Sequence, residues 1–103
     1  MKSKDPNAAR REKYQRMWDL TAEVIRNWDP EGLLAGGAPR DELDHEIASL
    51  VAQIPRIKSA ADAALAVSGI FGSNFDSDIF PAESCRDVGE KLFTALLEKG
   101  LLS

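Results

Sequence analysis

The chain has 103 residues, of which 44 % are hydrophobic and 29 % charged, with a formal net charge of −4 at pH 7. This length and composition are typical of one soluble globular domain and exclude a disordered or collagen-like chain. The single cysteine, Cys85, excludes a disulfide-stapled secreted protein, and the sequence shows neither a signal peptide nor an apolar run of membrane-spanning length, so a cytoplasmic location is expected.

The first predicted helix runs from about residue 7 to Trp28, because apolar side chains recur there on one helical face. The members of this stripe are Tyr14, Met17, Trp18, Thr21, Val24, Ile25 and Trp28. The helix is expected to stop before Pro30, since the residue preceding a proline disfavours the helical region. Residues 1–13 are predicted to be a basic, partly frayed segment, and residues 14–103 the helical domain.

Two further helices are predicted after a glycine-rich loop. One begins with Asp41 as its N-cap, has Asp44 three residues later, and ends near Pro55. The next begins after Ser59 and is rich in alanine, with Gly72 as its expected C-cap. Small side chains permit close helix approach, so this alanine-rich helix is predicted to lie centrally.

The fourth predicted helix extends from Pro81 to Lys99, with Pro81 in its first turn. Gly100 is expected in the left-handed conformation, and Leu101 should pack on Leu96 as in a Schellman motif. No stretch alternates with period two for long enough to predict a strand. The predicted fold is therefore all-α, a compact antiparallel bundle of about four helices in one domain.

No catalytic residue, metal site or cofactor is predicted. His45 is the only histidine, and zinc needs several imidazoles or thiolates. Residues 74–78 imitate the start of a calcium loop, but the required glycine and glutamate positions hold Ile79 and Cys85. Cys85 falls on the apolar stripe of its helix, where a cysteine is usually an inert small hydrophobe. The chain is accordingly predicted not to be an enzyme.

The modest net charge conceals an uneven distribution. Residues 1–16 hold six basic and two acidic residues, a net charge of +4, whereas residues 17–103 hold seven basic and fifteen acidic residues, a net charge of −8. Carboxylates concentrate where the first helix ends and the second begins. Many charge runs are only solvated faces, but this cluster would attract a basic protein and repel nucleic acid. The predicted partner contacts are Asp29, Glu31, Asp41, Glu42, Asp44 and Glu46, with Asp76 and Asp78 as a second patch.

The same region carries a resemblance. Residues 28–34 read Trp-Asp-Pro-Glu-Gly-Leu-Leu and residues 39–47 read Pro-Arg-Asp-Glu-Leu-Asp-His-Glu-Ile. The pattern resembles a family of small bacterial helical domains of unknown function, with Leu43 where that family usually has an aromatic residue. Some proteins with this pattern look like immunity proteins of bacterial toxin systems, including contact-dependent growth inhibition.

This resemblance implies an immunity protein that occludes the basic active-site surface of a cognate toxin domain, such as a nuclease. The alternative is a non-catalytic structural or regulatory helical domain. In that alternative the chain could pair as a homodimer through its aromatic stripe, which includes Tyr14, Trp18 and Trp28.

Overall fold

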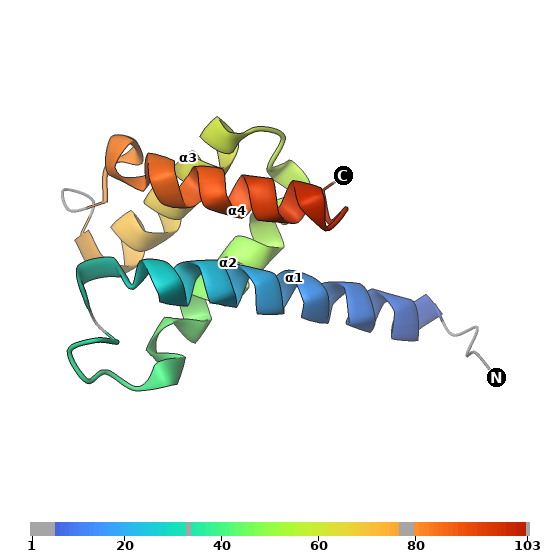
Figure 1. Ribbon diagram of the computed structural model, residues 1–103, viewed down its shortest axis with the longest axis horizontal. Coiled ribbons are helices and arrows are strands. Elements are labelled where there is room, and N and C mark those ends of the chain that lie inside the picture. The colour runs from blue at the N-terminus through green and yellow to red at the C-terminus, as the bar shows by residue number, and fades with distance from the viewer. Residues whose placement is uncertain (1–5, 33, 77–79, 103) are drawn as a thin grey trace.

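Four α-helices account for most of the chain in the computed structural model, which describes residues 6–32, 34–76 and 80–102 (Figure 1). The helices are α1 (Pro6–Trp28), α2 (Asp44–Gln53), α3 (Ala60–Phe71) and α4 (Arg86–Glu98). Within these described ranges no residue is assigned to a strand. The predicted all-α bundle is confirmed.

The helices pack around one core. In Figure 1, α1 and α4 lie side by side and run in opposite directions, and α3 packs against α4. α2 contacts both α1 and α3. The N-terminal part of α1 projects beyond the body, and every residue from 9 to 16 is exposed. The predicted boundary between residues 13 and 14 falls inside α1, which is one continuous helix from Pro6.

The stripe predicted on the first helix faces the core from Met17 onward. Thr21 and Ile25 are fully buried, and Met17, Trp18 and Trp28 pack against the core. Tyr14 is 48 % exposed, so this residue does not belong to the core. Most of the aromatic stripe is therefore already covered by this chain and is not free to form a homodimer interface.

α3 and α4 approach each other closely where Gly89 faces Ala64. A Cβ atom added to Gly89 would lie 2.6 Å from the Cα and backbone nitrogen of Ala64. Only a glycine fits at this distance, because the neighbouring atoms belong to backbone and cannot move aside cheaply. The close helix approach expected of the alanine-rich helix is therefore seen at α4, while its predicted central position stays a prediction.

Several helix ends form as predicted from local sequence. α1 ends at Trp28, and the Ser59 hydroxyl accepts a 3.1 Å hydrogen bond from the backbone N–H of Asp62 at the start of α3. After α4, Gly100 has φ +67°, and the N–H of Leu101 donates to the Leu96 carbonyl at 2.9 Å. The N–H of Gly100 donates to the Leu97 carbonyl at 3.1 Å, which completes the Schellman motif.

Two predicted helix starts are wrong. A 3-10 turn (Arg40–Leu43) precedes α2, so Asp41 is not the N-cap of this helix. Another 3-10 turn (Ala82–Cys85) precedes α4, so Pro81 lies one turn ahead of that helix. Leu43 and Cys85, which end these turns, are fully buried, so side-chain packing rather than capping sets where each helix begins. Gly72 is the C-cap of α3 as predicted, but its backbone is right-handed (φ −62°), and a π-helical turn (Gly72–Asp76) follows directly.

Thr21 carries a polar group that the core does not satisfy. Its side chain is fully buried, and its Oγ1 has no hydrogen-bond partner. We expect Thr21→Val to leave the free energy of unfolding unchanged or to raise it by up to about 1 kcal/mol, because valine keeps the shape and removes the unpaired hydroxyl. Urea denaturation measures this difference. A loss of stability greater than that amount would show that the hydroxyl makes a favourable contact.

Candidate partner-binding face

The loop that follows α1 is held by Asp29. This residue has φ +47°, and its carboxylate accepts hydrogen bonds from the backbone N–H groups of Leu34 at 2.7 Å and Ala35 at 3.0 Å. Aspartate tolerates the left-handed region better than most residues and bonds readily to nearby backbone. Asp29 therefore fixes the course of the loop, and its two oxygens are already engaged within the chain.

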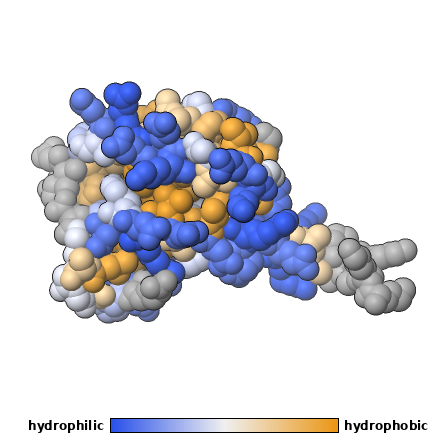
Figure 2. Space-filling model, in the orientation of Figure 1, coloured by the Kyte–Doolittle hydropathy of each residue, from blue (hydrophilic) through white to orange (hydrophobic). Residues whose placement is uncertain are grey.

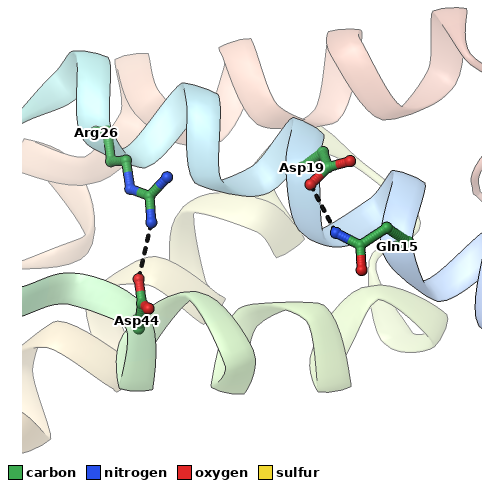
Figure 3. A network of polar contacts seen from close by, with 4 residues as sticks. All are labelled: Gln15, Asp19, Arg26 and Asp44. Carbon is green, nitrogen blue, oxygen red and sulfur yellow. Dashed lines mark hydrogen bonds and ion pairs between the residues drawn. The ribbon is translucent and has the colours of Figure 1, made fainter. Parts of the chain in front are cut away.

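Asp44 links α2 to α1. Its carboxylate lies 2.9 Å from Nη2 of Arg26 (Figure 3). The Arg26 guanidinium also lies 5.5 Å from the centre of the Trp18 ring. The Asp44 side chain is 42 % exposed and the Arg26 side chain is 21 % exposed. A partly exposed ion pair contributes about 0–1 kcal/mol, so its main effect is to fix the start of α2 beside α1 and to compensate the charge of Asp44.

Glu46 lies in the interior, contrary to its predicted place on an acidic surface. It is 6 % exposed, and its carboxylate accepts a 2.9 Å hydrogen bond from Nδ2 of Asn74, which lies in the turn after α3. A side chain this deeply buried cannot contribute to an exposed acidic face. Its position next to the apolar stripe, three residues after Leu43, is a signal that could have indicated this burial.

Asp41 and Glu42 remain as exposed carboxylates of the predicted cluster. They lie side by side on the 3-10 turn before α2, and we call this pair the acidic turn. The turn is anchored on its C-terminal side, because the following residue, Leu43, is fully buried and Asp44 is paired with Arg26. The side chains of Glu31 and Asp76, and all of Asp78, lie outside the described residues.

A second acidic feature was not among the predicted sites. Glu83, Asp87 and Glu90 are exposed and follow one another at spacings of four and three residues, a pattern that is visible in the sequence. Beside them lies a groove between α3 and α4 with a volume of about 400 Å³. Its lining residues are Ala60, Ala61, Ala64, Leu65, Ala82, Glu83, Arg86 and Glu90. We call it the α3–α4 groove.

The arrangement of the described side chains gives little support for a metal site or a membrane-spanning helix. His45 is exposed, and within the described part of the chain no three His, Cys, Asp or Glu side chains gather as a metal-binding group. No described helix has the length and apolar character to cross a membrane.

A comparison with known protein families shows to which family this chain belongs. A family model described as a domain of unknown function (DUF1871) matches residues 20–98. The chain belongs to this family. The DUF1871 match begins in the middle of α1 and extends to the end of α4, so it includes the acidic turn and the α3–α4 groove but not the projecting part of α1. No curated protein and no solved structure matches the chain.

Cys85 is expected to be unreactive in the folded protein. The side chain is fully buried, its Sγ lies 4.0 Å from the Phe80 carbonyl oxygen, and burial raises the pKa of the thiol. Because the thiolate is the reactive species, alkylation by iodoacetamide at mildly alkaline pH should be slow in buffer and fast in urea. Mass spectrometry of timed samples measures both rates. Equal rates in the two conditions would contradict the buried position.

Proposed function

We propose that this protein is a non-catalytic binding domain that acts as an immunity protein. Its partner is a cognate toxin domain with a basic surface, such as a nuclease. The observation that carries this proposal is the acidic turn, Asp41 and Glu42, exposed at the junction of α1 and α2 in a body of net charge −8. The choice of partner also follows the resemblance of this segment to a family pattern, because some proteins with that pattern look like immunity proteins.

The physical basis is charge complementarity. A nuclease needs a basic surface to hold its polyanionic substrate, and an acidic protein that covers this surface excludes the substrate. Opposite charges also speed the encounter of the two proteins, an effect that salt screens. The acidic turn is anchored by buried Leu43 and by the ion pair between Asp44 and Arg26, so little ordering is needed on binding.

The experiment first asks whether a gene next to that of this chain encodes a toxin domain, and a calorimetric titration with that domain then measures binding. We expect the double variant Asp41→Lys/Glu42→Lys to weaken binding by roughly tenfold or more, because it replaces two attractive charges with repulsive ones. The matched control is Asp87→Lys/Glu98→Lys, which makes the same change of charge at two exposed sites on α4. The control should bind almost as tightly as the wild type.

Two results would overturn the proposal. The first is no binding at micromolar concentration. The second is equal weakening by both double variants, which would reduce the effect to net charge alone. A substrate-cleavage assay completes the test, because an occluding partner must abolish cleavage when it is added in equimolar amount. A complex that forms but leaves cleavage intact would contradict occlusion.

A further inference from the structure

The projecting part of α1 differs in charge from the rest of the molecule. We call residues 8–16 the basic arm; it contains Arg10, Arg11, Lys13 and Arg16, and Glu12 is its one acidic residue. Residues 9–16 are exposed, including Tyr14 at 48 %. Figure 2 shows mainly hydrophilic residues along this projection, whereas apolar residues gather over the body.

The rest of the chain covers little of the surface of the basic arm. A helix of this length without tertiary contacts is marginally stable in water, so a surface that covers the arm would also stabilise it. The arm leads away from the body in Figure 1, and α1 is continuous across the point where it emerges. The arm therefore cannot reach the α3–α4 groove of the same molecule without breaking the helix.

The α3–α4 groove is complementary to the basic arm in charge and in apolar character. Its apolar lining consists of small alanine side chains and of Leu65, which is 60 % exposed. Its rim contains Glu83 and Glu90 around a single cation, Arg86, and Asp87 lies next to the rim. An apolar lining with an acidic rim suits a helix that presents arginine and lysine around an apolar or aromatic side chain.

We infer that the basic arm of one copy of this chain docks in the α3–α4 groove of a second copy. The arm carries a net charge of +3, and arginines and lysine on it would face the rim carboxylates while Tyr14 covers the alanine lining. The exchange is reciprocal in a twofold dimer, so each favourable contact occurs twice. Nucleic acid is a poorer occupant for the arm, because the attached body of net charge −8 repels a polyanion.

The test is the oligomeric state of the full chain by sedimentation equilibrium, from micromolar to millimolar concentration, at low and high salt. We expect a dimer at low salt that dissociates as salt is raised. Arg10→Glu/Arg11→Glu and Glu83→Arg/Glu90→Arg should each raise the dimer dissociation constant by roughly tenfold or more. The chain that combines all four substitutions should regain the dimer, because both charge patterns are then reversed together.

Asp41→Lys/Glu42→Lys is the matched control and should leave the dimer unchanged, since the acidic turn lies outside the groove. Circular dichroism of each variant verifies the fold. A monomer at every concentration, or a dimer that ignores both pairs of substitutions, would overturn the inference. The inference would also be overturned if the chain were a monomer that binds a duplex oligonucleotide and the Arg10→Glu/Arg11→Glu variant lost this binding. The toxin titration does not depend on these variants, so either proposal can fail alone.

Discussion

Phe71→Ala is expected to lower the free energy of unfolding by about 3–5 kcal/mol, the range for truncation of a fully buried phenylalanine. Phe71 is completely buried at the end of α3. Its ring centre lies 5.2 Å from that of Trp28, 5.6 Å from that of Phe80 and 5.8 Å from that of Phe75. Truncation would therefore leave a cavity in the middle of an aromatic cluster that joins α1 to the segment before α4.

Urea denaturation followed by tryptophan fluorescence measures this loss, because Trp28 packs edge-on against Phe71. The matched control is Phe75→Ala, which removes the same side chain from a position that is 44 % exposed. The control should lose much less stability, since most of the cost of truncation comes from buried surface and cavity formation. Equal losses at the two positions would contradict the packing described for this cluster.

Gly89→Ala is expected to destabilise the protein by about 1–3 kcal/mol, the usual cost of overpacking a tight contact. The added methyl group would lie 2.6 Å from backbone atoms of Ala64, so α3 and α4 would have to move apart. This cost should exceed the gain of up to about 1 kcal/mol that alanine brings over glycine inside a helix.

Gly69→Ala on α3 is the matched control for Gly89. Gly69 is exposed, and an added Cβ would meet no atom within 4 Å. We expect this substitution to raise the stability by about 0.5–1 kcal/mol, because only the helix propensity changes. Thermal or urea denaturation of the two variants compares them directly. A stabilising Gly89→Ala would show that the two helices are farther apart than described here.

Local signals predicted most of the fold. The apolar stripes located the four helices, and Ser59 and Gly100 marked two helix ends through hydrogen bonds to nearby backbone. The starts of α2 and α4 could not be predicted in this way. Asp41 and Pro81 have the right chemistry for helix starts, but the burial of Leu43 and Cys85, which depends on distant helices, requires a tighter turn first.

The candidate site was harder to predict than the fold, because carboxylates close in sequence have different partners in space. Asp29 bonds to the loop that follows it, Asp44 pairs with Arg26 eighteen residues earlier, and Glu46 bonds to Asn74 twenty-eight residues later. Of the clustered acids on the described surface, Asp41 and Glu42 stay exposed at the junction. Charge clustering alone could not separate these roles.

The salt dependence of affinity for the toxin domain tests the proposed function most directly. It should be measured for the wild type and for Asp41→Lys/Glu42→Lys. The wild type should bind tightly at low salt and lose affinity steeply as salt rises, whereas the double variant should bind more weakly with a shallower slope. Wild-type and variant titrations with the same affinity and the same slope would contradict a binding face built on the acidic turn.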